Sequence, residues 1–133
     1  MVIMLLALVV CACGAGGTSE GDNQPTSQSP TPSVLAQACS TYESFARYAR
    51  EDMAHFTRTT EEIVMQLTEY QDSFDTYAAR LSGSESDTVQ ALADAIGHLK
   101  NAMASFGPFD EVTTGNLRNV IHRAEALLAI CPH

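Results

Sequence analysis

The sequence lacks the short motifs by which catalytic and cofactor sites are usually recognised. It has no G-x-S-x-G nucleophile turn, no Gly-rich phosphate loop and no C-x-x-C-H haem attachment site. A di-iron bundle needs inward Glu residues and two Glu-x-x-His motifs, whereas this chain has one related spacing, from Asp52 to His55. We therefore predict no enzyme, no catalytic residue, no metal site and no cofactor. An enzyme that uses no such motif stays open as a third alternative.

Basic residues are also scarce. The chain has 7 Lys and Arg against 16 Asp and Glu, which gives a formal net charge of -9. Nucleic-acid binding depends on the neutralisation of phosphates by Lys and Arg, so this balance argues against a nucleic-acid partner. It also argues against an electrostatic hold on anionic lipid headgroups. Any attachment to a membrane would therefore need another source.

Long hydrophobic runs are absent after the first residues, where the chain is continuously apolar from Met1 to Ala12. A helix of that length reaches about 18 Å, well short of the ~30 Å hydrocarbon core of a bilayer. The run therefore indicates the apolar region of a signal peptide, residues 1–12. No Lys or Arg precedes Ala12, although export signals normally carry a basic residue there, which leaves the true translation start open.

The end of this run resembles that of a bacterial lipoprotein precursor. The sequence reads Val10, Cys11, Ala12, Cys13, and Ala12 is the small residue that this family places before its lipidated cysteine. The resemblance implies lipidation at Cys13, because the branched Val10 fits the position before Cys11 poorly. It further implies a protein anchored to the cell membrane on its extracytoplasmic face. A freely secreted protein with an incidental cysteine is the alternative.

A polar segment separates this start from the rest of the chain. Residues 14–33 are rich in Gly, Ser, Thr, Pro, Gln and Asn, and Glu20 and Asp22 are their charged side chains. Such a composition cannot bury enough apolar surface to order itself, so residues 13–33 are predicted to form a disordered linker. Its prolines should stiffen this spacer between the membrane and a domain at residues 34–133.

From Val34 onward the apolar residues recur at the spacing of amphipathic helices, without strand-like alternation. Capping residues and glycines divide this pattern into helices near 34–57, 60–82, 86–106 and 111–131, with a break near 50–52 left open. The short connections predict an all-α fold, an up-down four-helix bundle. The expected inward positions are Leu35, Cys39, Tyr42, Phe45, Ala46, Ala49, Met53 and Phe56; Ile63, Leu67, Tyr70, Phe74, Tyr77 and Leu81; Val89, Leu92, Ile96, Leu99, Met103 and Phe106; and Leu117, Ile121, Ala124, Leu128 and Cys131.

Two cysteines remain in the predicted domain, Cys39 and Cys131. The up-down topology places the start of the first helix and the end of the fourth at the same end, so these residues can form a disulfide. An even number of cysteines in the domain is typical of a protein in an oxidising compartment, where they can pair. A disulfide that closes a loop this long is expected to stabilise the fold by about 4 to 5 kcal/mol in the chain-entropy model. Two separate buried thiols are the alternative. A metal site is disfavoured because no His lies at ligand spacing from either cysteine.

The polar candidates each have a structural and a functional interpretation. The acids of the second helix are expected on its solvated face, the alternative being a patch for a basic partner or a divalent ion. The histidines are expected at the surface, although His98 and His122 could pair across helices. The residues concerned are Glu61, Glu62, Glu69, Asp72 and Asp75, and His55, His98, His122 and His133.

Three tyrosines occupy positions where Leu would pack more simply: Tyr42, Tyr70 and Tyr77. They either bond within the bundle or line a partly polar cavity between the first and second helices, with room left by nearby alanines. No family is recognised for this helical domain. We expect a lipid-anchored binding or interaction module of the bacterial cell envelope with a possible envelope protein partner. The alternative is an envelope carrier or sensor that takes a metal, haem or small amphiphile into the bundle core.

Overall fold

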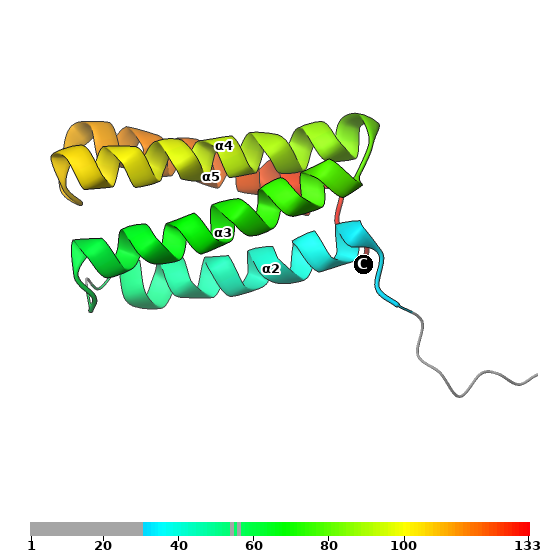
Figure 1. Ribbon diagram of the computed structural model, residues 1–133, viewed down its shortest axis with the longest axis horizontal. Coiled ribbons are helices and arrows are strands. Elements are labelled where there is room, and N and C mark those ends of the chain that lie inside the picture. Colours follow the sequence, from blue (N-terminus) through cyan, green and yellow to red (C-terminus); the bar gives the residue numbers. More distant parts are fainter. Residues whose placement is uncertain (1–30, 54, 56) are drawn as a thin grey trace, which may run out of the picture. The chain divides into compact units, whose positions relative to one another are not determined.

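The computed structural model describes residues 31–53, 55 and 57–133, and in this part of the chain it is an all-α four-helix bundle (Figure 1). The helices are α2 (Val34–Tyr48), continued by the π-helical turn η3 (Ala49–Met53), then α3 (Thr60–Arg80), α4 (Gly83–Phe106) and α5 (Glu111–Leu128). The predicted fold class is therefore confirmed. The predicted signal segment, most of the predicted linker, Cys13 and Phe56 lie outside the described residues.

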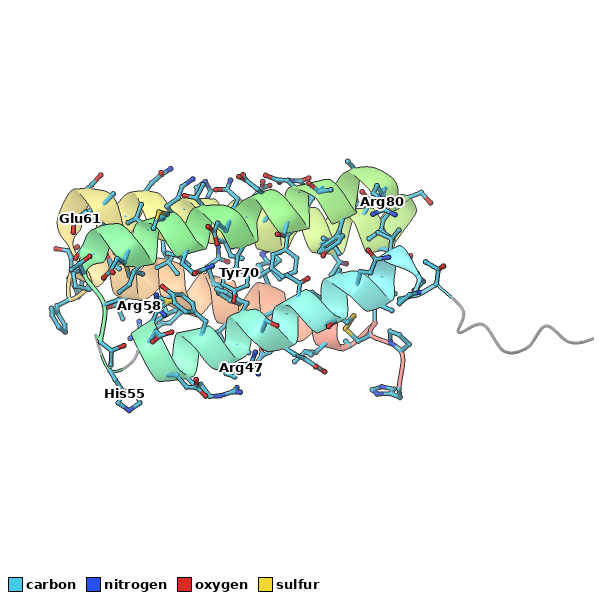
Figure 2. All side chains as sticks on the ribbon, turned by 60° about the horizontal axis from the view of Figure 1, so that its bottom comes forward. Arg47, His55, Arg58, Glu61, Tyr70 and Arg80 are labelled. Atoms are coloured by element: carbon cyan, nitrogen blue, oxygen red, sulfur yellow. A yellow bond between two sulfur atoms is a disulfide. The ribbon has the colours of Figure 1, made fainter. Side chains whose placement is uncertain are left out.

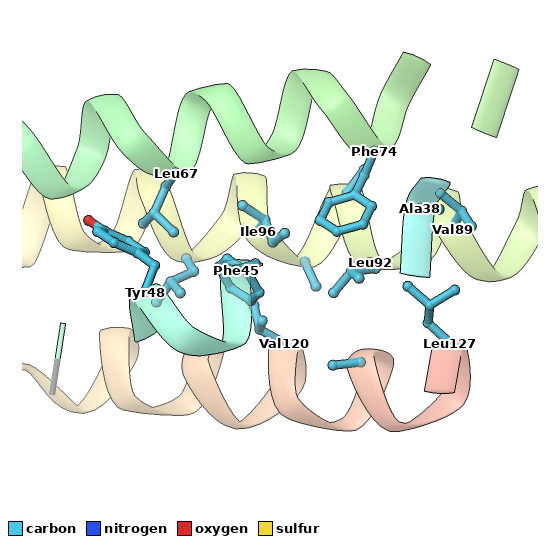
Figure 3. Packing of buried hydrophobic residues seen from close by; sticks show 14 of the residues in the cluster. Ala38, Phe45, Tyr48, Leu67, Phe74, Val89, Leu92, Ile96, Val120 and Leu127 are labelled. Carbon is cyan, nitrogen blue, oxygen red and sulfur yellow. The ribbon is translucent and has the colours of Figure 1, made fainter. Parts of the chain in front are cut away.

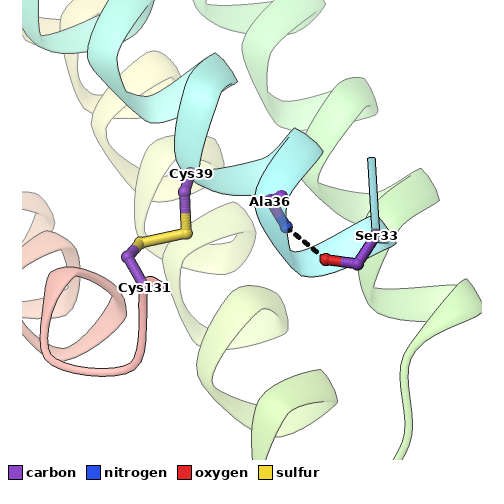
Figure 4. The surroundings of a disulfide bond; sticks show 4 residues. All are labelled: Ser33, Ala36, Cys39 and Cys131. Atoms are coloured by element: carbon purple, nitrogen blue, oxygen red, sulfur yellow. Dashed lines mark hydrogen bonds between the residues drawn. A yellow bond between two sulfur atoms is a disulfide. The ribbon is translucent and has the colours of Figure 1, made fainter. Parts of the chain in front are cut away.

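Three of the helices, α2, α3 and α5, begin at a residue whose side chain caps them. Ser33 Oγ accepts a hydrogen bond from Ala36 N at 3.1 Å (Figure 4), and Asp110 Oδ1 accepts one from Val112 N at 2.8 Å. At α3, Thr59 N donates to Glu62 Oε2 at 2.8 Å and Thr59 Oγ1 accepts from Glu62 N, which completes a capping box. The hydrogen bond from the Thr59 backbone lowers the pKa of Glu62. These caps explain why the starts of α2, α3 and α5 were predictable, whereas Ser82 before α4 makes no such hydrogen bond.

The helix ends differ from the prediction at three places. The first α-helix stops at Tyr48 and changes to the π-helical η3, where the sequence left a break open. The last helix ends at Leu128, three residues before the predicted end. The third helix starts at Gly83, before the predicted start near residue 86. It stops before Gly107 as expected, and the φ of 86° at Gly107 is a left-handed value that favours glycine.

The core lies mainly between α3 and α4, whose backbones approach closely along their length, and between α4 and α5 (Figure 3). Its largest fully buried side chains are Phe74, Ile63, Leu67, Leu92, Ile96, Leu99, Leu127, Val89 and Val120. α2 adds Ala38, Phe45 and Tyr48 to this core, yet it approaches α5 at few points. The bundle is thus tightly packed on one side and loosely packed on the other.

A disulfide joins the loose side at one end. Cys39 and Cys131 are bonded, with their Cα atoms 5.9 Å apart (Figure 4). This pairing confirms the prediction and places the beginning of α2 beside the end of α5 (Figure 1). No helix in the described part of the chain is long and apolar enough to cross a membrane.

Candidate functional site

An apolar cavity of about 460 Å³ lies between α2 and α5, where the two helices leave space. We call it the α2–α5 groove. Its lining residues are Tyr42, Phe45, Ala46, Ala49, Arg50, Leu117, Val120, Ile121, Ala124, Glu125 and Leu128. Two of these apolar side chains, Ile121 and Leu128, are 52% and 43% exposed. The groove therefore presents apolar surface to solvent beside an internal space.

The groove exists because small side chains face it from both helices. Ala46 on α2, Ala49 on η3 and Ala124 on α5 line it, and none of them reaches across the gap. Helices with small residues at their interface could approach closely, but α2 stays against α3 through larger side chains. Phe45 and Tyr70 stack edge to face with ring centroids 5.1 Å apart. The aromatic contact on one side of α2 thus leaves the alanine side uncovered.

A second cavity of about 210 Å³ adjoins the groove beneath η3. Ala49 and Leu117 line both cavities, so the two spaces are neighbours. The smaller one also contains two threonines, but Thr113 Oγ1 donates to Gly107 O at 2.7 Å and Thr114 Oγ1 to Asp110 O at 3.0 Å. Because these hydroxyl protons are already used, the wall of the smaller cavity is almost entirely apolar in character.

Two charged residues line the groove, Arg50 and Glu125. Among the described residues the ion pair found is Arg58 with Asp52, at 3.3 Å, so Arg50 has no carboxylate partner there. The acidic residues gather elsewhere: α3 carries five carboxylates and a single Arg80. The groove thus has an unpaired cation in a protein that is acidic as a whole.

Tyr70 and Tyr77 follow the first of the two interpretations and pack or bond within the bundle, because aromatic rings occupy the space between the first and second helices where the alternative placed a cavity. Tyr70 lies between α3 and α2 (Figure 2), and its ring centroid is 5.8 Å from that of Tyr48. Tyr77 shares a hydrogen bond of 2.9 Å with Thr41 Oγ1. Tyr42 does line a cavity, but between α2 and α5. The three alanines leave room as expected, at a different interface.

Tyr48 was not identified by sequence reasoning, although it is a buried residue with a polar hydroxyl group. It is 7% exposed, and its hydroxyl has no hydrogen-bond partner among the described residues. Burial raises the pKa of Tyr48 to about 12 and also raises the pKa of Tyr70. Both phenols therefore stay neutral in the physiological range and act in packing, outside the groove lining.

The inward positions predicted for the last helix are partly wrong. Ala124 is buried as predicted, but Val120 and Leu127 are buried where Ile121 and Leu128 were expected, and these last two are 52% and 43% exposed. Phe106 is likewise 59% exposed instead of inward. The sequence did contain a signal: Val120–Ile121 and Leu127–Leu128 are apolar pairs seven residues apart. Such pairs make the apolar face of the helix wider than the part that packs against the core. The remaining part, with Ile121 and Leu128, lines the groove.

The other polar candidates lie at the surface or close to it. His55, His98, His122 and His133 are exposed, and Figure 2 shows His55 beyond the end of α2. The acids of α3 are exposed except Asp75, which is half-buried and accepts a hydrogen bond from Gln90 Nε2 at 2.7 Å. No group of three His, Cys, Asp or Glu residues in the described ranges is placed to hold a metal ion.

The geometry assembles an apolar groove between two helices that a disulfide joins, with Arg50 at the groove and without an ion-pair partner among the described residues. It brings together Tyr42 and the three alanines, and it leaves Tyr70, Tyr77 and the histidines elsewhere. Sequence reasoning missed Arg50, because a lone exposed Arg has no distinctive spacing, and it expected Leu117 to face inward without assigning it to a groove. Comparison of the chain with protein-family models, with curated proteins and with solved structures finds no match.

Proposed function

We propose that this protein is a lipid-anchored, extracytoplasmic binding module of the bacterial cell envelope, and that the α2–α5 groove is its binding surface. The carrying observation is the apolar cavity of about 460 Å³, flanked by exposed Ile121 and Leu128. Ligand pockets typically have volumes of ~300 to 1,000 Å³ and are mostly apolar with a few polar groups. The groove fits that description.

The cellular placement rests on the beginning of the sequence. Residues 1–12 serve as the signal peptide, Cys13 carries the lipid and residues 14–33 form the spacer. Several acyl chains make such an attachment stable, at ~0.8 kcal/mol for each buried CH₂. The Cys39–Cys131 disulfide supports this placement, because disulfides persist in oxidising compartments outside the cytoplasm. The acidic domain itself offers no electrostatic attachment to anionic lipid.

A second candidate function is a carrier or sensor for a small amphiphile. It is favoured by the smaller cavity beneath η3, which extends the groove toward the interior between Met53, Leu99 and Met103. Protein partners usually meet flatter surfaces, whereas a narrow adjoining space suits a chain-like molecule. The groove lining has neither His nor Cys, so its chemistry is poorly suited to a metal or haem.

Substitution of the anchor residue tests the placement. We expect Cys13→Ser to move the protein from the membrane fraction to the soluble extracytoplasmic fraction, while the matched Cys11→Ser leaves it in the membrane. Intact mass of the wild-type chain should show acyl groups at Cys13. The assignment would be contradicted if the Cys13→Ser protein stayed in the membrane fraction. It would also be contradicted if Cys11→Ser released the protein from the membrane to the same extent as Cys13→Ser.

Native mass spectrometry of the domain purified from its own host tests the binding role. A bound small mass supports the carrier function, and stoichiometric partner subunits support an interaction module. A mass equal to that of the oxidised chain alone, at concentrations where partners would stay bound, counts against both.

A further inference from the structure

We propose that the α2–α5 groove binds a single-chain amphiphile with an anionic headgroup, its apolar chain lying along the alanines and its headgroup at Arg50. The inference rests on the proposed binding function and specifies the ligand. Three features carry it: the length and apolar character of the space, the charge at its edge and the π-helical turn that supplies its residues.

The space has the form of a channel between antiparallel helices. From Tyr42 to Met53 the two adjoining cavities follow α2 and η3, a distance of ~16 Å at the helical rise per residue. Apart from Tyr42, Arg50 and Glu125, the side chains that line the groove are apolar. In the smaller cavity, Thr113 and Thr114 already use their hydroxyl protons. A polar ligand buried there would lose its hydrogen bonds to water without replacement. A flexible hydrocarbon chain fits this space.

Arg50 determines the charge of the headgroup. It is exposed, lines the groove and has no ion-pair partner among the described residues. Its guanidinium can bind a carboxylate or a phosphate through two parallel hydrogen bonds. Glu125 lies on α5 nearer to the disulfide and would repel an anion there. This arrangement favours one orientation, with the headgroup at the η3 side of the groove.

The π-helical turn gives this side its particular geometry. Ala49, Arg50 and Met53 all belong to η3, and each lines at least one of the two cavities. A π-turn inserts an extra residue into the helical repeat and is often found at functional sites. Here it directs Ala49 and Met53 toward the smaller cavity while it keeps Arg50 at the groove. An uninterrupted α-helix would change this register.

Calorimetric titration of the chain from residue 13 onward, with Cys13→Ser and the disulfide formed, tests the ligand class. The probes are decanoate, dodecanoate and tetradecanoate below their critical micelle concentrations. We expect saturable binding of one ligand per chain, with affinity rising by roughly fourfold for each added CH₂ until the space is filled. Dodecyltrimethylammonium should bind more weakly than dodecanoate, because its headgroup meets Arg50.

Two exposed arginines close in sequence, Arg50 in the groove lining and Arg47 outside it, make a matched pair. Arg50→Gln should weaken dodecanoate binding by roughly 10-fold or more, the loss expected for a hydrogen bond to a charged group. Arg47→Gln removes an equal charge from a residue outside the groove lining and should leave affinity within about twofold. Equal losses for both variants would overturn the assigned headgroup position.

Filling the groove tests the position of the chain. Ala46→Phe should abolish binding while circular dichroism and the melting transition remain those of a folded bundle. If that variant does not fold, Ala49→Leu replaces it as the groove-filling variant.

The headgroup is tested by comparing dodecyl phosphate with dodecanoate. Tighter binding of dodecyl phosphate would assign a phosphate headgroup, and tighter binding of dodecanoate a carboxylate. Absence of saturable binding, or binding that survives both filled variants, overturns the inference. A partner found by native mass spectrometry would then leave the binding function standing, whereas a bare chain there would remove both.

Discussion

The α3–α4 interface and the α2–α5 interface of this bundle are held together in different ways. Across the first, Phe74, Leu92 and Ile96 are 0% exposed. Polar bonds add to this packing, since Lys100 Nζ donates to Gln71 Oε1 at 2.8 Å and Ser86 Oγ donates to Ala78 O at 2.8 Å. Across the second, a disulfide joins one end and a cavity of about 460 Å³ occupies the middle. One interface is therefore packed, and the other is cross-linked.

This difference explains how a small domain can keep an open groove. Where a cavity separates two helices, their side chains lack the dispersion contacts and the buried apolar surface that would otherwise hold the helices together. The cross-link compensates because it restricts the unfolded chain and does not require the helices to fill the space between them. The groove and the disulfide are thus complementary features of the same interface.

The largest expected effect comes from removing that cross-link. The bond spans 92 residues of sequence, so the chain-entropy model predicts that Cys39→Ser with Cys131→Ser lowers the free energy of unfolding by about 4–5 kcal/mol. Urea unfolding measures the loss. Hydrogen exchange should then show the amides of α2 losing protection before those of α4, since α2 has the weaker remaining contacts. Uniform loss of protection across all helices would contradict the comparison.

The next effect compares a large side chain at each interface. Phe74→Ala removes a fully buried ring between α3 and α4 and should cost about 3–5 kcal/mol. Ile121→Ala removes a side chain that is 52% exposed at the groove, so we expect a loss below about 1 kcal/mol. Thermal and urea unfolding of both variants measure the pair. A cost for Ile121→Ala near that of Phe74→Ala would show that the groove is closed in solution.

Much of the fold was predictable because its determinants are local. Thr59 with Glu62, Ser33 and Asp110 mark helix starts through hydrogen bonds within a few residues, and the spacing of Ile63, Leu67 and Phe74 marks one buried face. The disulfide followed from topology and the position of two cysteines. These features need no knowledge of how neighbouring helices are rotated.

The groove could not be predicted in the same way, because it depends on helix rotation and on the spacing between elements. Whether Ile121 or Val120 faces the core depends on a small rotation of α5 about its axis, and both choices give an apolar seam with Ala124 inward. Whether Ala46 lets helices approach or leaves a space depends on the aromatic contact of Phe45 with Tyr70 on the other side of α2. One of the alternatives left open by the sequence placed spare room between the first and second helices, whereas the structure has it between α2 and α5.

The smallest expected effects enlarge a small residue at each interface. Gly97 of α4 faces α3 so closely that an added Cβ would lie 2.8 Å from Gln71 Nε2, and Gln71 also binds Lys100. Gly97→Leu should therefore displace Gln71 and lower the free energy of unfolding by about 1–3 kcal/mol, despite the better helix propensity of Leu.

Ala46→Leu is the matching change at the other interface. The added methyl groups extend into the groove, where they have free space and apolar neighbours. We expect its free energy of unfolding to stay within about 1 kcal/mol of wild type or to rise, as for other cavity-filling substitutions. Urea unfolding of the two variants side by side measures the difference, and a loss at Ala46→Leu as large as that at Gly97→Leu would mean that α2 and α5 pack as tightly as α3 and α4.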